Sequence, residues 1–319
     1  MQQPAGPLKT TGAFAAIYLL WGGTYLAIAL GLQSIPAFLL IASRSLIGGG
    51  VLLLVSHLRA SRPCPPGDWG HAAVGGAFFF IGCHGALAYA QREVPSGLSA
   101  ILLATIPFWI VIVNAMVVRS EPLQRLLGLL PGFAGAALIA WHETSSSTRP
   151  VSWEMMLLLL ASALSWALGT VYSQRKAAHI PSDQLAAMQL VCGGAGLFIL
   201  SALAGEWKGF AIENVTLVSM TAMLYLALLG SAVGNTAYLW LLDRTPAPIV
   251  ATYTFVNPVI ALLLGWWVLG EQMTWISLGG AALVVSSIVM LLWHSQDAAE
   301  KHVRPRRSHS TAERPLGRA

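Results

Sequence analysis

The stretch TPAPIVATYTFVNPVIALLLGWWVLGE, residues 245–271, decides the fold of this chain. It is a long apolar segment with Pro258 near its middle and a glutamate at its end. About 150 residues earlier, residues 94–121 spell a related segment, VPSGLSAILLATIPFWIVIVNAMVVRSE, with Pro107 near its middle and again a closing glutamate. The residues that follow each copy are also alike. Self-similarity at a fixed offset indicates a repeated structural unit, so we interpret the chain as one unit written twice.

The bulk composition is that of a membrane protein. Hydrophobic residues make up 56% of the chain and charged residues 10%, with a mean hydropathy of +0.67, whereas soluble domains carry roughly 25% charged residues. Crossing a bilayer core of about 30 Å takes about 20 apolar residues in a helix. The 319 residues therefore have space for about ten spans and for no sizeable extramembrane domain.

Several classes of function are excluded by what the sequence lacks. The net charge of +5 does not indicate a nucleic-acid partner, because the basic residues form no stripe with interleaved aromatic residues. The three cysteines form no CxxC pair, so neither a disulfide framework nor a metal site is predicted. Walker A, GxGxxG, HExxH and GxSxG motifs are missing from the chain. We therefore expect no cofactor and no ATP-driven pumping by this chain alone.

The apolar segments predict an all-α integral membrane fold of ten transmembrane helices, five in each half. In the first half the predicted spans cover about 12–32, 36–56, 70–91, 96–118 and 124–142. In the second half they cover about 153–174, 182–204, 215–242, 246–269 and 274–294. The first repeat is thus 12–142 and the second 153–294, and a polar, basic tail, 295–319, is predicted to be disordered.

Basic residues predict the orientation, because loops rich in Lys and Arg stay on the cytoplasmic side. Fourteen of the 18 Lys and Arg residues fall on one predicted side, three fall in the opposite loops, and Arg44 lies inside a span. Both termini are therefore predicted to be cytoplasmic. Since each repeat has an odd number of helices, the second copy must enter the membrane from the opposite side. Two inverted repeats around a central cavity are typical of secondary transporters.

Short motifs in both halves resemble the drug/metabolite transporter superfamily in its ten-helix EamA-type form. The motifs are LWGGTY at 20–25, ASR at 42–44, VPSG at 94–97, SWA at 165–167, NP at 257–258 and GE at 270–271. Within the superfamily the chain looks most like bacterial exporters of amino acids, including aromatic amino acids. The resemblance implies two inverted five-helix repeats in the bacterial inner membrane and export of small metabolites.

The two mid-span prolines, Pro107 and Pro258, are candidate hinges. Each removes a backbone hydrogen bond, and the carbonyl left over must be satisfied by neighbours or line a cavity. Their matching positions in the two repeats favour a shared mechanical role in opening and closing. A static packing kink is the alternative interpretation.

Polar and aromatic residues inside the spans are the candidate substrate-binding residues, because intramembrane polar groups are functional candidates by default. His84 is the histidine well inside a span, although a buried histidine is often just hydrogen-bonded to a neighbour. Tyr89 lies on another side of the same helix, so both cannot point straight at one ligand. Cross-linking of helices is the competing role for the polar members. The further candidates are Trp21, Tyr25, Trp109, Trp166, Asn235, Tyr238, Tyr253 and Asn257.

The charged residues constrain the mechanism. Arg44 lies in the second span, and we interpret it as structural, with its head reaching the surface or binding carbonyls at a helix end. All 13 acidic residues fall in predicted loops, tails or span edges, which argues against ion coupling through a carboxylate in the middle of the membrane. Facilitated transport along the solute gradient is the resulting expectation.

The leading hypothesis is an exporter of small metabolites, including aromatic amino acids, that works by alternating access. Its expected partners are a small-molecule substrate and membrane lipid, and a monomer would suffice. One alternative is an intramembrane enzyme with His84 as base and Ser231 as nucleophile. The others are a transporter of drugs or nucleosides and a passive channel, which saturable flux and counterflow would distinguish from a carrier.

Overall fold

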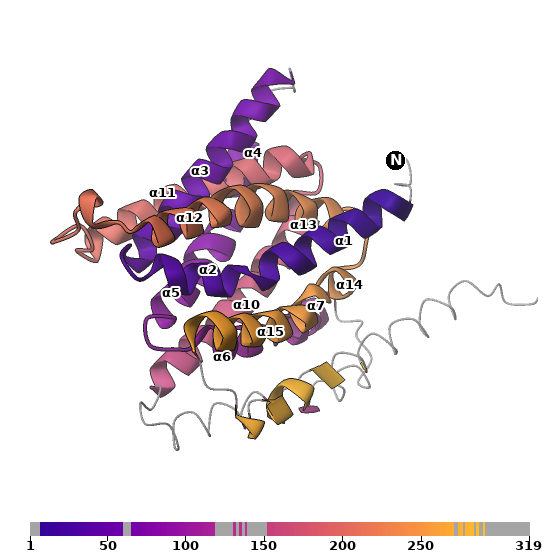
Figure 1. The fold of residues 1–319 in the computed structure, drawn as a ribbon. Helices are drawn as coiled ribbons and strands as arrows, with labels where there is room; N and C mark the ends of the chain where they lie inside the picture. Colours follow the sequence, from indigo (N-terminus) through magenta and orange to yellow (C-terminus); the bar gives the residue numbers. More distant parts are fainter. Residues whose placement is uncertain are drawn as a thin grey trace, which may run out of the picture.

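The structure, a computed structural model, describes residues 7–59, 65–118 and 152–270, together with parts of 130–138 and 274–290. The regular structure of these residues is all helical (Figure 1), which confirms the predicted all-α class for this part of the chain. Among the described residues, seven helices are long and apolar enough to cross a membrane. They are Leu8–Gly31, Ala37–Leu58, Pro66–Ala90, Ser96–Val117, Trp153–Lys176, Ser182–Leu203 and Leu217–Leu242.

Several of these spans consist of shorter helical elements placed end to end. The elements of the first half are α1 (Pro7–Gly22), α2 (Thr24–Gly31), α3 (Ala37–Leu58), α4 (Pro66–Gly76), η1 (Ala77–Gly85), α5 (Ala86–Ala90), α6 (Ser96–Leu103) and α7 (Ile106–Val118). Those of the second half are α10 (Trp153–Lys176), α11 (Ser182–Leu203), η2 (Ile212–Asn214), α12 (Leu217–Tyr225), η3 (Leu226–Val233), α13 (Gly234–Leu242), α14 (Ala247–Val250), α15 (Tyr253–Leu264) and η4 (Gly265–Leu269).

The segment predicted as a single span at 246–269 is helical but interrupted. A turn at Ala251 and Thr252 separates α14 from α15. The predicted spans at 124–142 and 274–294 lie largely outside the described residues, and the tail 295–319 lies wholly outside them.

Prolines and hydroxyl residues mark where the helices begin. Proline occupies the N-cap of five helices, at Pro36, Pro65, Pro95, Pro181 and Pro246. Its ring fixes φ and it has no N–H, which suits a helix start because the first N–H groups of a helix have no intrahelical partner. α10 and α12 begin instead at Ser152 and Thr216, whose hydroxyl oxygens accept hydrogen bonds from the backbone N–H groups of Met155 and Ser219.

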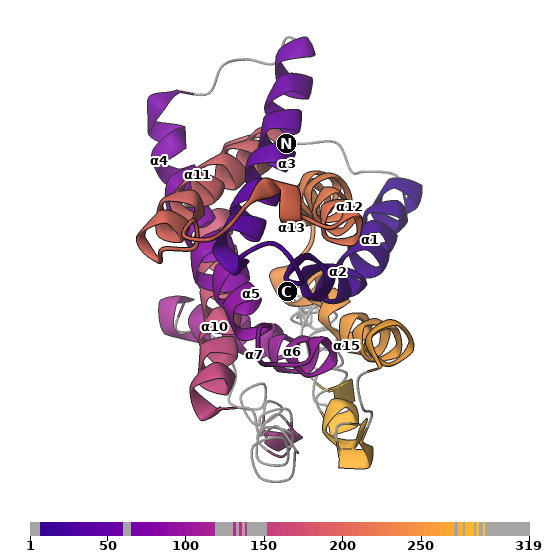
Figure 2. The same cartoon turned by 60° about the vertical axis from the view of Figure 1, so that its left-hand side comes forward.

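The helices α3 and α11 form the most extensively packed pair of described helices and lie on the same side of the molecule as α4 in Figure 2. A Cβ added at Gly49 would come within 2.8 Å of the Val191 side chain, and one at Gly194 within 3.0 Å of the Leu46 side chain. Glycine at these points lets the two backbones approach closely. Since Gly49 of α3 meets the earlier residue of α11 and Leu46 the later one, the two helices are antiparallel.

The carboxylate of Glu206 lies at one end of this helix pair, which we call the Glu206 end. Glu206, in the segment that follows α11, accepts hydrogen bonds from the backbone N–H groups of Phe38 (3.0 Å) and Leu39 (2.9 Å) in the first turn of α3. Ser201 donates a further bond of 2.8 Å to the same carboxylate. A negative charge at a helix N-terminus is stabilising, so Glu206 holds the start of α3 beside the end of α11.

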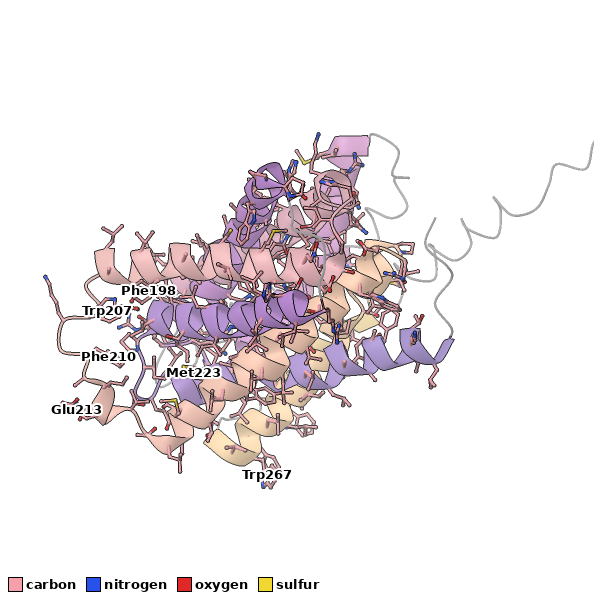
Figure 3. All side chains as sticks on the ribbon, turned by 90° about the horizontal axis from the view of Figure 1, so that it is seen from above. Phe198, Trp207, Phe210, Glu213, Met223 and Trp267 are labelled. Carbon is pink, nitrogen blue, oxygen red and sulfur yellow. The ribbon has the colours of Figure 1, made fainter. Side chains whose placement is uncertain are left out.

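Aromatic residues cover the Glu206 end. Figure 3 shows Trp207 beside Phe198, with Phe210 and Glu213 further along the same segment and Trp267 pointing away from the helices elsewhere. The rings of Trp207 and Phe198 meet edge to face at 5.0 Å. Half-exposed tryptophans at a helix end suit the membrane interface. At the opposite end, which we call the His179 end, His179 contacts Asp68 at 2.9 Å.

Each of the two helices α3 and α11 also packs on the third span of the other half. α3 packs on η3, where a Cβ at Gly48 would meet the Ala227 carbonyl, and α11 packs on α4 and η1, where a Cβ at Gly76 would meet the Gln189 carbonyl. η1 and η3 are both π-helical and occupy the middle of the third span of each half. π-helical turns inside α-helices are rare and occur frequently at functional sites.

Candidate functional site

A small cavity of about 30 Å³ lies between the first, third and fourth spans of the first half and the helices α10 and α15 of the second half. Its walls therefore come from both halves of the chain. The lining residues are Trp21, Thr24, Tyr25, Cys83, His84, Leu87, Leu103, Ile106, Trp166, Tyr253 and Asn257. Six of the residues predicted from the sequence are among them, namely Trp21, Tyr25, His84, Trp166, Tyr253 and Asn257.

Aromatic rings close together form most of the wall. The Trp21 ring lies 5.4 Å from Trp166, 5.3 Å from Tyr238 and 4.7 Å from Tyr253, measured between ring centroids, with edge-to-face or tilted geometry. Edge-to-face pairs place the positive edge of one ring against the negative face of another, which is worth about 0.5–1.5 kcal/mol beyond the burial of area. The first span and α10, α13 and α15 of the second half are thus joined through one indole.

A relay of hydrogen bonds fixes the Trp166 indole. Its Nε1–H donates to the Tyr238 hydroxyl at 3.1 Å, and the Tyr238 hydroxyl lies 2.7 Å from the Thr170 hydroxyl. Thr170 in turn donates to the Trp166 carbonyl at 2.9 Å, so its oxygen accepts the proton of Tyr238. All three groups are buried. Tyr238 does not line the cavity but positions a residue that does.

The Trp21 indole is fixed from the second half of the chain. Its Nε1–H donates to the Gly230 carbonyl in η3 at 2.8 Å. One turn later, Gly234 begins α13 directly against the indole, and a Cβ at this position would overlap Trp21 Nε1. Glycine is therefore required at 234 for the indole to adopt this orientation.

His84 lies within η1 and has one ring nitrogen engaged. Nδ1 is 3.0 Å from the Phe79 carbonyl, and because a carbonyl only accepts, Nδ1 carries the proton of this bond. In a neutral ring Nε2 is then a hydrogen-bond acceptor. The ring stacks on Phe80 and meets Trp166 edge to face at 5.3 Å. His84 therefore forms the hydrogen bond to a neighbour that is usual for a buried histidine, and its ring also lines the cavity.

Asn257 offers a second acceptor at the cavity. It is 2% exposed and lies directly before Pro258 in α15. Its Oδ1 has no hydrogen-bond partner among the described residues. An unpaired buried acceptor is costly unless a ligand or water supplies a donor, so the cavity favours solutes that carry hydrogen-bond donors.

Three further predicted residues, besides Tyr238, do not line the cavity. The Tyr89 ring stacks on Phe38 at 5.6 Å, and the Arg92 guanidinium lies over it at 5.2 Å. Asn235 is buried in α13, and Trp109 is partly buried in α7. The sequence predicted that Tyr89 and His84 face different sides of one span, and the structure places them so.

The two predicted hinges differ in their helical context. Pro258 lies in the interior of α15. Pro107 is the second residue of α7, after a turn at Ala104 and Thr105. In the first turn of a helix a missing N–H costs little, so Pro107 does not kink α7. The interruption of the fourth span is instead the turn at Ala104 and Thr105, before Pro107.

Five residues that line the cavity were not predicted from the sequence, namely Thr24, Cys83, Leu87, Leu103 and Ile106. Cys83 directly precedes His84, and Leu87 follows it by three positions, so helical spacing from His84 was the available signal. Leu103 and Ile106 flank the turn in the fourth span. Within the described ranges no three His, Cys, Asp or Glu side chains gather as metal ligands would.

Arg44 departs from one of its two predicted arrangements. The prediction that its head reaches the surface is wrong, because the residue is 2% exposed. Its Nε and Nη1 atoms are buried and make no hydrogen bond in the described part of the chain.

Comparison with known proteins identifies the family. The model of the EamA-like transporter family matches residues 10–141 and 153–293. The chain belongs to this family of membrane transporters. The family model thus matches once in each half, and the cavity described above takes residues from both matched segments.

Two of the similar proteins carry transport names. A protein of Escherichia coli strain K12 named "Uncharacterized inner membrane transporter YedA" is 30% identical over 289 residues, which is 89% of this chain and 90% of that protein. A "Probable amino-acid metabolite efflux pump" of Salmonella typhimurium is 28% identical over 85% of this chain and 91% of that protein. A crystal structure with 20% identity has a TM-score of 0.67 and covers 92% of this chain and 99% of its own, which supports the fold.

Proposed function

We propose that this EamA-family protein exports small metabolites, including aromatic amino acids, across the bacterial inner membrane by alternating access. The observation that carries the proposal is the central cavity, which combines aromatic rings from both halves with the acceptors His84 Nε2 and Asn257 Oδ1. Aromatic walls suit an apolar or aromatic side chain, and the acceptors suit an ammonium group. The name of the Salmonella relative supports an amino-acid metabolite as the cargo.

The proposed architecture is ten helices in two inverted repeats, with both termini cytoplasmic. The two matched segments of the family model support the duplication. The antiparallel α3 and α11, which are the second spans of the two halves, support the inversion, as do the π-helical segments in both third spans. The excess of basic residues on the predicted inner side supports the orientation. Both proposed repeats belong to one chain, so a monomer would suffice.

The cavity is contracted in this structure. A volume of about 30 Å³ accommodates about one or two waters and no amino acid. The rings of Trp21, Trp166 and Tyr253 occupy the space between the halves. Binding of a solute therefore requires the helices to separate. Pro107, Pro258 and the two π-helical segments are the places where the spans are interrupted, and we propose that they bend during this movement.

Counterflow in proteoliposomes tests the proposal. Vesicles loaded with unlabelled phenylalanine are expected to accumulate labelled phenylalanine transiently, because a carrier exchanges solutes whereas a channel does not. A panel with nucleosides and cationic drugs tests the alternative substrates. Trp166→Ala is expected to lower the rate about tenfold or more, whereas Trp153→Ala on the same helix, at a residue 47% exposed, is expected to retain it. Flux equal to that of empty vesicles for every amino acid would refute the assignment.

The intramembrane enzyme is not favoured. Ser231 Oγ is buried and makes no hydrogen bond to His84 or to any other described group. Nδ1 of His84 donates its hydrogen bond to the Phe79 carbonyl and not to a serine. A nucleophile and its base are expected within hydrogen-bond reach of one another, and these two residues are not so paired.

A further inference from the structure

Arg44 carries a charge for which the described structure holds no counter-charge. The residue lies two turns into α3 and is 2% exposed. Two of its three guanidinium nitrogens, Nε and Nη1, are fully enclosed without a hydrogen-bond partner among the described residues. A buried cation is normally paired or hydrogen-bonded, because moving it out of water is costly. The functions assigned so far give this group no role.

No acidic residue of the described segments is available to pair with it. These residues lie at helix ends or in loops, at Asp68, Glu93, Glu154, Asp183, Glu206, Glu213 and Asp243. Glu206 is held at the start of the same helix by the N–H groups of Phe38 and Leu39. Arg44 lies five to six residues further along α3, which is about 8–9 Å at 1.5 Å per residue.

The charge of Arg44 acts on the central cavity. Cys83 and His84, which line the cavity, lie within range of the guanidinium charge. α3 packs against η1, the segment that carries them. Arg44 itself does not line the contracted cavity, so in this state its charge acts across Cys83 and His84. In a medium of low dielectric constant such an interaction is much stronger than in water.

We propose that Arg44 supplies the counter-charge for a carboxylate of the transported solute, which binds beside Cys83, while the ammonium group of the solute, and not the carboxylate, binds the acceptor His84 Nε2. The proposal rests on the proposed transport function and narrows its substrate class. Solutes with a carboxylate, zwitterionic amino acids among them, are carried, and amines that lack a carboxylate are discriminated against. The aromatic rings and the Asn257 acceptor then bind the remainder of the solute.

A pair of solutes that differs in the carboxylate tests the proposal. Phenylalanine and phenylalaninamide share the ring and the amine, and the amide lacks the negative charge. In counterflow the wild-type protein is expected to prefer phenylalanine by about tenfold or more, the size of a charge-assisted contact. Arg44→Gln is expected to reduce this preference to about twofold, by lowering flux of the acid and sparing that of the amide. Arg44→Lys is expected to retain part of it.

Arg92→Gln is the matched control, since this arginine lies over Tyr89 and not at the cavity, and it is expected to keep the wild-type preference. A second measurement does not depend on transport or on the variant folding. The unfolding temperature of the purified wild-type protein is recorded with phenylacetate and phenylacetamide, and with phenylalanine and phenylalaninamide. Each carboxylate is expected to stabilise the protein more than its amide.

The outcomes separate the two proposals. If no solute is transported but carboxylates stabilise the protein selectively, the transport assignment fails and the role of Arg44 stands. If amino acids are transported with equal preference for acid and amide, or if Arg44→Gln keeps the wild-type preference, the role of Arg44 is overturned and the transport function stands. Equal stabilisation of the wild-type protein by acid and amide also overturns it.

Discussion

Replacing Tyr238 by phenylalanine removes one hydroxyl from the centre of the bundle and leaves the ring in place. The hydroxyl accepts the Trp166 Nε1–H bond of 3.1 Å and donates to Thr170 over 2.7 Å. Both bonds join α10 to α13, and the residue is fully buried. The substitution therefore deletes two interhelical hydrogen bonds while the aromatic contacts of Tyr238 with Trp21 and Trp166 remain.

The expected loss of stability follows from these two bonds. Interhelical hydrogen bonds in membranes contribute about 0.6 kcal/mol on average and up to about 1.7. The Trp166 N–H is left buried without a partner, and an unsatisfied buried donor costs about 1–3 kcal/mol. We therefore expect Tyr238→Phe to lower the free energy of unfolding by about 1.5–3 kcal/mol. Without this hydrogen bond the Trp166 indole is no longer held in one orientation at the cavity wall, so binding of an aromatic amino acid is weakened. KM for such a solute is therefore expected to rise about three- to tenfold.

Unfolding in mixed detergent micelles, monitored by tryptophan fluorescence, measures the change in the free energy of unfolding. Counterflow measures KM. Tyr172→Phe is the matched control, because its hydroxyl makes a single bond of 2.9 Å to His71 at a partly buried position near the His179 end. The control is expected to cost less than about 1 kcal/mol. A Tyr238→Phe variant as stable as Tyr172→Phe, with an unchanged KM, would refute the assigned relay.

Two further predictions concern contacts between the halves. Gly234→Ala places a Cβ into the Trp21 indole, so the transport rate is expected to fall about tenfold. Gly12→Ala is the control, because a Cβ added there would have no atom within 4 Å. A Gly234→Ala protein with the wild-type transport rate would contradict the argument. Glu206→Gln removes the charge at the start of α3 and is expected to cost about 1 kcal/mol, seen as a lowered unfolding temperature. The exposed Glu213→Gln is expected to cost nothing measurable, and equal effects of the two glutamine variants would argue against the cap.

Much of the candidate site was predictable because polar residues inside spans are few. His84 and Asn257 stand out in apolar segments, and both line the cavity. Trp21 and Trp166 were predicted from their depth in their spans and do the same. Tyr89 is also an aromatic residue within a span, yet it stacks on Phe38. Lipid is as apolar as the inside of the bundle, so hydrophobicity does not distinguish the lipid-facing side of a helix from its packed side.

Arg44 shows most directly what sequence alone leaves undecided. Its position in a span is evident from the sequence, but whether a long side chain reaches the surface or turns inward depends on what packs around it. Here α11 and η3 cover α3 through close contacts at Gly49, Gly194 and Gly48, and the guanidinium is enclosed.

The sequence by itself determined that this is an all-helical membrane protein with a duplicated unit, because span length and repeat spacing are properties of the linear chain. Only the tertiary structure decided which residues meet. The fourth span breaks before Pro107, the cavity is contracted by three aromatic rings, and a single arginine lies behind its wall. These features depend on the rotation of each helix about its axis and on close glycine contacts between helices far apart in the chain, which no local pattern encodes.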